Sequence, residues 1–116
     1  MLPKQNRLTS TKDFQNITKT GVRVYSDVAV IYTLANATSQ KNSQVGLIVS
    51  KVVGNSVVRH RISRQIRNIV RDQLQNIPGN IQMVIRALPA IKDKDFIEIK
   101  KILSESITKS IVKANV

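Results

Sequence analysis

The chain has 116 residues, with 19 lysines and arginines against seven acidic residues and a net charge of +12. A chain of this length forms one domain, and we expect residues 1–116 to do so. Isoleucine, valine and leucine are abundant enough for a hydrophobic core. The absence of cysteine excludes disulfides, thiol nucleophiles and cysteine-ligated zinc. The longest apolar run, residues 28–32, is far too short to cross a membrane.

The positive charge is concentrated in one part of the chain. Residues 51–71 carry six basic side chains and no acid, so half of the net charge lies in 21 residues. A concentrated basic segment is the electrostatic footprint of a protein that binds a polyanion. The lack of an amphipathic pattern of lysine and tryptophan favours nucleic acid over a membrane surface. We therefore expect a cytoplasmic protein with no membrane partner and no obligatory protein partner.

The N-terminal part of the chain predicts a short helix. Residues 1–8 read as an extended polar segment. Ser10 or Thr11 is suited to cap a helix whose apolar side includes Phe14 and Ile17. Gly21 then suits the left-handed position that follows many helices.

Residues 22–50 predict β-structure. Alternating apolar residues over 22–34 indicate two strands, or one bent strand, with a break near Ser26 and Asp27. The polar segment 36–43 reads as a flexible loop. Residues 44–50 are again rich in strand-forming residues.

The second half predicts a helix, a strand and a helix. Asn55 is a good cap for a helix that runs to about Gln75, and residues 78–79 form a Pro-Gly turn. Residues 81–88 read as a buried strand. The last helix begins near Asp93 or Asp95, where Asp95 and Glu98 make a capping box, and runs towards Lys113.

The resulting order is α-β-β-β-α-β-α, which predicts an α+β sandwich, a sheet with helices on one face. The final helix carries an apolar stripe that we interpret as core packing rather than as a base-stacking platform. The stripe consists of Phe96, Ile99, Ile102 or Leu103, Ile107 and Ile111.

The helix after Asn55 separates into two faces at 100° per residue. The apolar face would pack on the sheet and contains Val58, Ile62, Ile66, Ile69, Val70 and Gln73. The opposite face contains His60, Arg64, Arg67 and Arg71, with Arg61 on its flank. Like charges three and four residues apart repel and destabilise a helix, so a polyanion that relieves the repulsion is one interpretation. A solvated basic face without a specific partner is the other.

The start of this helix has further candidates. Arg59 projects on the apolar side and is placed to reach round the helix end, towards the sheet. Gly54 permits a tight connection, and the free N–H groups at the helix start suit a phosphate. His60 is a single histidine without partner ligands, so we expect no metal there.

The segment from Val45 to Lys51, followed by Gly54 to Arg67, resembles the signature of the bacterial ribonuclease P protein subunit. Arg7-Leu8 with Asp13-Phe14 before Gly21, and Val84 to Ala90, resemble other parts of that family, and the resemblance extends over about residues 5–110. Four positions depart from the usual pattern. They are His60 in place of asparagine, Val52 in place of lysine, Ser63 in place of a basic residue and Thr18 in place of an aromatic.

The resemblance implies a fold and an activity. The fold would be like domain 2 of ribosomal protein S5, with a left-handed β-α-β crossover, whereas about 98% of such crossovers are right-handed. The protein would bind the catalytic RNA and the 5′ leader of precursor tRNA and assist endonucleolytic removal of the leader. Catalysis would reside in the RNA, which would also bind most of the Mg²⁺. The chain itself would contribute neither a catalytic residue nor a metal ligand.

The resemblance also implies two binding surfaces. The RNA subunit would be bound by Asn55, Arg59, His60, Arg61, Arg64 and Arg67. The leader would be bound by Phe14, Tyr32, Lys51 and Arg59, with Arg23 and Arg86 as weaker candidates for phosphate contacts. For Phe14 a plain helix-to-sheet packing role stays open, and for Tyr32 a place along a strand edge.

Two other classes of protein fit the composition. A small ribosomal protein would be equally basic but would lack an aromatic and basic cleft beside the arginine-rich helix. A helix-turn-helix DNA-binding module is disfavoured, because strands rather than a helix precede Asn55.

Overall fold

The computed structural model describes residues 2–35 and 43–115. Its helices and strands follow the predicted order α-β-β-β-α-β-α. They are α1 (Thr11–Thr20), β1 (Val22–Tyr25), β2 (Ala29–Ala35), β3 (Gln44–Ile48), α2 (Ser56–Gln73), β4 (Ile81–Ala87) and α3 (Phe96–Ala114). Short 3-10 turns occur at Lys4–Asn6, Leu74–Asn76 and Pro89–Asp93. Most of the loop predicted at 36–43, namely residues 36–42, lies outside the described residues.

The four strands form one mixed sheet in the order β1-β2-β4-β3. β2 pairs antiparallel with both β1 and β4, whereas β3 and β4 are parallel. The predicted break between the first two strands is confirmed. Ser26 makes the turn, because its Oγ accepts hydrogen bonds from the N–H groups of Val28 at 3.4 Å and Ala29 at 3.1 Å.

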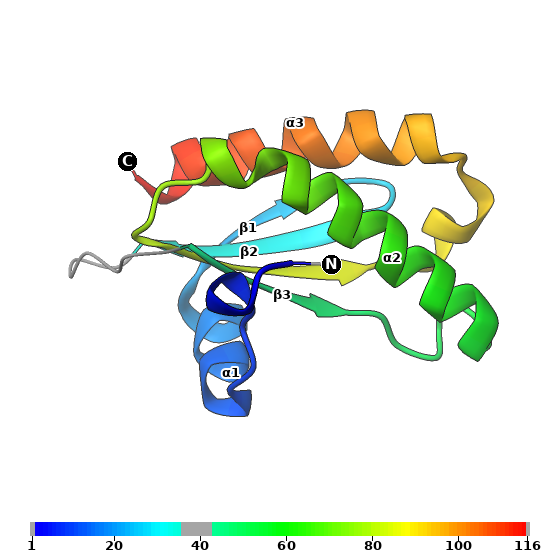
Figure 1. The fold of residues 1–116 in the computed structure, drawn as a ribbon, viewed down its shortest axis with the longest axis horizontal. Helices are drawn as coiled ribbons and strands as arrows, with labels where there is room; N and C mark the ends of the chain where they lie inside the picture. The colour runs from blue at the N-terminus through cyan, green and yellow to red at the C-terminus, as the bar shows by residue number, and fades with distance from the viewer. Residues whose placement is uncertain (1, 36–42, 116) are drawn as a thin grey trace.

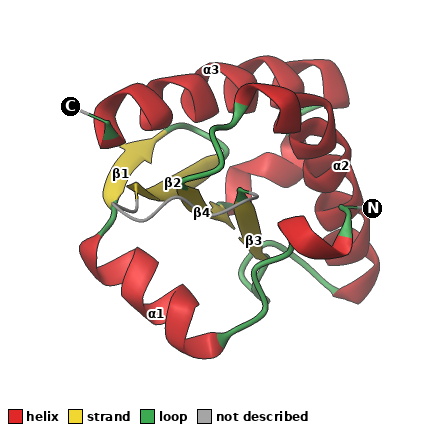
Figure 2. Ribbon diagram, turned by 60° about the vertical axis from the view of Figure 1, so that its left-hand side comes forward, coloured by secondary structure: helices red, strands yellow, loops and turns green. Residues whose placement is uncertain are grey.

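β3, α2 and β4 form a left-handed β-α-β unit, as the resemblance implied. Both strands point to the right in Figure 1, and α2 returns above them. In Figure 2 the strands run away from the viewer, with β3 to the right of β4 and α2 on the upper side. The chain therefore turns anticlockwise as it moves from β3 to β4, opposite to the sense of about 98% of such units.

Helices cover both faces of the sheet, so the expectation of helices on one face was wrong. α2 and α3 lie on one side and α1 lies on the other (Figure 1). The reason is that β2 and β4 are apolar at successive positions, and successive side chains of a strand point to opposite faces. Ile31, Met83 and Ile85 join the main core under α2 and α3, whereas Val84 joins a smaller cluster with Leu8 and Ile17 under α1.

The helix starts follow the capping residues in the sequence. The Ser10 side chain accepts a hydrogen bond from the Asp13 N–H, and Asp95 Oδ1 accepts one from the Glu98 N–H at 2.8 Å. Gly21, by contrast, is extended, with φ −71° and ψ 160°, so the left-handed expectation was wrong. Gly21 is required by space instead, because a Cβ there would lie 2.6 Å from the carbonyl oxygen of Ile17.

Residues 2–8 are not the extended segment that the sequence suggested. Lys4–Asn6 forms a 3-10 turn, and Leu2 and Leu8 are buried. The Leu8 N–H donates to the carbonyl oxygen of Val45 at 3.1 Å, so this segment covers part of the outer edge of β3. Covering an edge strand removes a template for unwanted pairing.

The apolar stripe of α3 is buried only after its first turn. Ile99, Leu103 and Ile107 are fully buried, as predicted. Phe96 is the first residue of the helix and is 38% exposed, and Ile97 is 78% exposed, so the core assignment of Phe96 was wrong. No helix in the described part of the chain is long and apolar enough to span a membrane.

Candidate nucleic-acid interface

The first candidate surface is the solvent-facing side of α2. The helix packs through Ile62, Ile66 and Ile69, which are buried in the main core. Its opposite side carries exposed basic side chains, which we call the arginine face: His60, Arg61, Arg64, Arg67 and Arg71. The orientation predicted from the helical periodicity is therefore confirmed, since the apolar stripe fixes which side of the helix meets the sheet.

The arginine face has no ionic partner within residues 2–35 and 43–115. The salt bridge in this part of the chain joins Lys94 to Glu98, with 3.9 Å between Nζ and Oε2, and lies far along the chain from α2. Asp72 is the first acid on α2 and lies in its last turn. Like charges at this spacing repel. A polyanion bound to the face would relieve the repulsion and would gain the full attraction of uncompensated charges.

The N-terminal end of α2 adds hydrogen-bond donors to the same region. Asn55 caps the helix by accepting a hydrogen bond from the Val58 N–H at 3.0 Å. Gly54 precedes it, and a Cβ at this position would lie 2.9 Å from Val58 Cγ1. Lys51 is exposed in the turn between β3 and α2. The remaining N–H groups of the first turn carry the positive end of the helix dipole, which favours anions.

Arg59 is half-buried, and its Nε is shielded from solvent without a hydrogen-bond partner among the described residues. Beside it lies a hollow of about 370 Å³ that is also lined by Ser56, His60, Ser63 and Arg67. A buried donor without a partner costs about 1–3 kcal/mol. An oxygen acceptor of a bound phosphate in this hollow would remove that cost.

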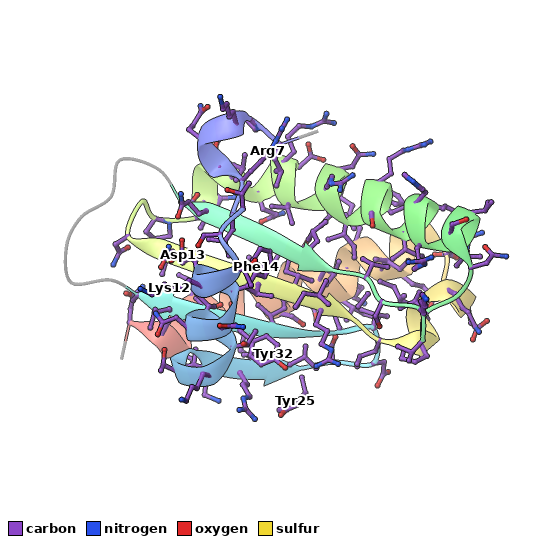
Figure 3. The ribbon with its side chains drawn as sticks, turned by 90° about the horizontal axis from the view of Figure 1, so that it is seen from below. Arg7, Lys12, Asp13, Phe14, Tyr25 and Tyr32 are labelled. Carbon is purple, nitrogen blue, oxygen red and sulfur yellow. The ribbon has the colours of Figure 1, made fainter. Side chains whose placement is uncertain are left out.

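The second candidate surface is the face of the sheet that carries α1 (Figure 3). Strand register places Arg23, Tyr32, Val84 and Gly46 in one row across β1, β2, β4 and β3. Phe14 of α1 lies over the Gly46 end of this row, because a Cβ on Gly46 would collide with the Phe14 ring. We call this region the α1-side sheet face.

Phe14 and Tyr32 are both partly exposed on this face. Both pack against the small cluster formed by Leu8, Ile17 and Val84. The Cζ of Arg23 lies 5.8 Å from the centroid of the Tyr32 ring, within the range of a cation–π contact. Packing and access to solvent are therefore combined in both residues, so a packing role does not exclude a stacking role.

One hollow joins the two surfaces at the edge of β3. It has a volume of about 280 Å³ and is lined by Phe14 and Gly46, by Arg7 and by Arg67 of the arginine face. The Nε of Arg7 donates a hydrogen bond of 2.9 Å to the Leu2 carbonyl oxygen, which holds the guanidinium near this edge. The family resemblance implied two separate sites for Phe14 and Arg67, whereas the structure places both residues on one hollow.

Two other residues predicted to bind the leader, Lys51 and Arg59, do not line the same hollow as Phe14. The hollow beside Phe14 contains neither Arg59 nor Lys51, because Arg59 lines the hollow on α2 and Lys51 is exposed in the preceding turn. Two residues were missed by the sequence patterns. Arg7 was used only as a family marker, and Tyr25, which is 67% exposed on β1, was not considered. Period-two alternation from Arg23 would have placed Tyr25 on the same face.

The described part of the chain has no group of three or more histidine and acidic side chains that could hold a metal ion. Mg²⁺ prefers carboxylate oxygens in octahedral geometry. Both candidate surfaces present arginines and aromatic rings instead, so their residues do not fit a Mg²⁺ site.

Comparisons with known proteins agree with this architecture. The Ribonuclease P family model matches residues 2–111. The ribonuclease P protein component of Mycolicibacterium gilvum (strain PYR-GCK) is 44% identical over 94 residues, which cover 80% of this chain and 76% of that protein. The solved RNase P protein of Staphylococcus aureus has a TM-score of 0.80 and 29% identity, covering 91% of this chain and 97% of the other.

The RNase P protein of Thermotoga maritima has the same fold, with a TM-score of 0.74, 23% identity and coverage of 85% of this chain and 92% of the other. The family match covers nearly the whole chain, and the fold, including its left-handed crossover, agrees with that match. The chain belongs to the bacterial ribonuclease P protein family.

Proposed function

We propose that this chain binds both the catalytic RNA of ribonuclease P and the 5′ leader of precursor tRNA, and so assists the removal of the leader. Membership of the family supports association with the RNase P RNA and a role in tRNA processing. The observation that carries the two-surface proposal is the hollow at the edge of β3, which Arg67 and Phe14 both line. It makes the arginine face continuous with the α1-side sheet face.

The RNA subunit binds to the start of α2 and along its solvent-facing side. Asn55 and Arg59 at the helix start, and His60, Arg61, Arg64 and Arg67 along it, provide this surface. Guanidinium groups bind phosphate oxygens in a planar, bidentate manner, and their attraction is uncompensated here by acidic side chains. The unpaired Nε of Arg59 gains an acceptor in the same step.

The leader binds across the α1-side sheet face. Phe14 and Tyr32 offer rings on which bases stack, and Arg23 and Arg86 supply positive charge on this face. Lys51 and Arg59, at the start of α2, supply further charge for the phosphates of the leader. Stacking contributes about 1–3 kcal/mol per base and tolerates any base. A surface of this kind suits leaders of varied sequence.

Catalysis belongs to the RNA subunit in this proposal, with Mg²⁺ held mainly by that RNA. The reason is that hydrolysis of a phosphodiester by metal ions needs ligands that the two surfaces do not offer. The complex acts in the cytoplasm on precursor tRNA and needs no other protein.

A small ribosomal protein is the alternative function. It would also carry a basic helix, but it would have no use for a partly exposed aromatic face beside that helix. The row from Arg23 through Tyr32 to Gly46 and Phe14 is such a face and favours the ribonuclease P interpretation.

The test is reconstitution of the full chain with a bacterial ribonuclease P RNA. We expect the chain to lower the Mg²⁺ concentration at which the RNA removes the leader from precursor tRNA. The Arg64→Ala/Arg67→Ala variant should lose most of this effect, whereas Lys100→Ala/Lys101→Ala on α3 should keep it. No change in the Mg²⁺ requirement with the unaltered chain would favour the ribosomal-protein alternative.

A further inference from the structure

Tyr25 is the most exposed aromatic side chain in the described part of the chain. It is the last residue of β1 and is 67% exposed, whereas Phe14 and Tyr32 are only partly exposed. A tyrosine ring has a large apolar area, and leaving it in water forfeits the free energy of burial. The fold does not bury this ring, so its face is open to a partner.

Strand register puts Tyr25 on the α1-side sheet face. Arg23 lies on the α1-side sheet face, because its guanidinium contacts the Tyr32 ring. Tyr25 comes two residues later on β1, so its side chain points to the same face. Tyr25 pairs with Val30, two residues before Tyr32, so the two tyrosines are diagonal neighbours about 7–8 Å apart between Cα atoms. Figure 3 shows Phe14, Tyr32 and Tyr25 one after another across this face.

Two arginines lie on the same face of the sheet as the exposed ring. Tyr25, Val30, Arg86 and Ile48 form a row across the four strands, and Arg86 is exposed in that row. Arg23 is exposed beside Tyr25 on β1. Neither guanidinium has an ionic partner in the described ranges. An exposed ring on the same face as two guanidinium groups without acidic partners has the parts that bind one nucleotide, since the base stacks and the phosphate pairs with arginine.

We propose that Tyr25, with Arg23 and Arg86, forms a further subsite for one nucleotide of single-stranded RNA, whose base stacks on the Tyr25 ring. The subsite rests on the proposed leader-binding function and extends it. β1 and β3 are opposite edges of the sheet, and the arginine face lies at the β3 edge. Tyr25 therefore takes the leader nucleotide that lies furthest from the RNA-subunit surface, and only longer leaders reach it.

The first experiment measures the affinity of the reconstituted holoenzyme for precursor tRNAs whose leaders are lengthened one nucleotide at a time. Tyr25→Ala should leave the affinity for short leaders and for mature tRNA unchanged and should weaken binding of long leaders by about 5- to 10-fold. Tyr25→Phe keeps the ring and should bind long leaders like the unaltered chain. Ile97→Ala removes an even more exposed apolar side chain from α3 and should change nothing.

The second experiment observes the subsite directly. The chain contains no tryptophan, so Tyr25→Trp introduces a single indole on the α1-side sheet face. Stacking of a base should quench its fluorescence when precursor tRNA with a long leader binds, and mature tRNA should not quench it. Ile97→Trp is the matched control and should respond to neither RNA.

The outcomes separate this subsite from the proposed function. If lengthening the leader raises the affinity of the unaltered chain, but Tyr25→Ala gains equally and the indole is not quenched, the subsite is refuted and leader binding stands. If lengthening the leader never raises the affinity of the unaltered chain, the leader-binding function itself fails. If Tyr25→Ala lowers the affinity equally for precursor tRNAs with short and with long leaders, Tyr25 does not contact a distal leader nucleotide and the subsite is overturned.

Discussion

Two glycines of this chain are required by neighbouring atoms rather than by their own backbone angles. Gly46 on β3 leaves room for the Phe14 ring, and a Cβ would also come within 3.2 Å of Leu8 Cβ. Gly21 at the end of α1 leaves room for backbone, since a Cβ would lie 2.9 Å from the Thr33 carbonyl oxygen. A ring can move aside, whereas paired backbone cannot, so the two positions should respond differently to substitution.

Gly46→Ala should displace the Phe14 ring from β3. Overpacking of this kind costs about 1–3 kcal/mol of stability. The displaced ring would also narrow the hollow that Arg7 and Arg67 share with it, so affinity for the leader should fall. Urea unfolding measures the first effect and binding of precursor tRNA measures the second.

Gly21→Ala is the matched control for that substitution. Its clash is with carbonyl oxygens of α1 and β2, so stability should fall while leader affinity of the folded molecules stays unchanged. Equal losses of leader affinity in both variants would show that Phe14 packs without contacting RNA.

At the level of elements, α2 and α3 begin in the same way but face different partners. Asn55 and Asp95 each accept a hydrogen bond from the N–H three residues later, at 3.0 Å and 2.8 Å. Replacing either cap by alanine should cost about 1 kcal/mol of stability. Only Asn55 lies beside the arginine face, so the two caps give an internal comparison.

Asn55→Ala and Asp95→Ala should therefore destabilise the fold about equally, and only Asn55→Ala should weaken binding to the RNA subunit. Asn55→Asp keeps a capping oxygen but adds negative charge, so it should retain stability and still lose RNA affinity. Filter binding at several salt concentrations measures the affinity for the RNA subunit, and thermal unfolding measures the stability of each variant. Unchanged RNA affinity in both Asn55 variants would remove this residue from the interface.

The arginine face should be visible in the salt dependence of RNA binding. If Arg64 and Arg67 each bind a phosphate of the RNA, Arg64→Ala or Arg67→Ala should reduce the slope of log K against log[salt] by about 0.7–0.9. Lys101→Ala, on the exposed side of α3, is the control and should leave the slope unchanged. A slope that stays constant in the arginine variants would mean that the face is merely solvated.

For the molecule as a whole, the net charge of +12 destabilises the folded state in the absence of RNA. Self-repulsion among like charges opposes a compact fold, and salt screens it over about 10 Å at 0.1 M. Unfolding temperature should therefore rise between low salt and physiological salt, by about 4 °C for each kcal/mol of repulsion that is screened. Differential scanning calorimetry over a sodium chloride series measures the change.

A charge-reversed variant is the control for this effect. Arg64→Glu lowers the net charge and breaks the run of like charges on α2, so its unfolding temperature should rise less with salt. If salt lowered the unfolding temperature of the unaltered chain, repulsion would not be the dominant charge effect. The inference that charge repulsion on the arginine face destabilises the protein without RNA would then be wrong.

Local features of the fold were predictable because local physics decides them. The caps at Ser10, Asn55 and Asp95 depend on a side chain and an N–H three residues away. The buried and exposed sides of α2 follow from a repeat of 3.6 residues, which separates Ile62 from Arg64 whatever the helix packs against. The family resemblance then implied the left-handed crossover, against the usual preference.

Tertiary structure decided the features that depend on where elements meet. The sequence by itself determined the order of elements, the capped helix starts and the direction of the arginine face, because each follows from neighbours a few residues away. Only the fold put α1 on the opposite face from α2, left Phe96 and Tyr25 exposed and brought Arg7, Phe14 and Arg67 to one hollow. Strand pairing sets those positions, since a residue's face and neighbours depend on register with strands far away in the chain.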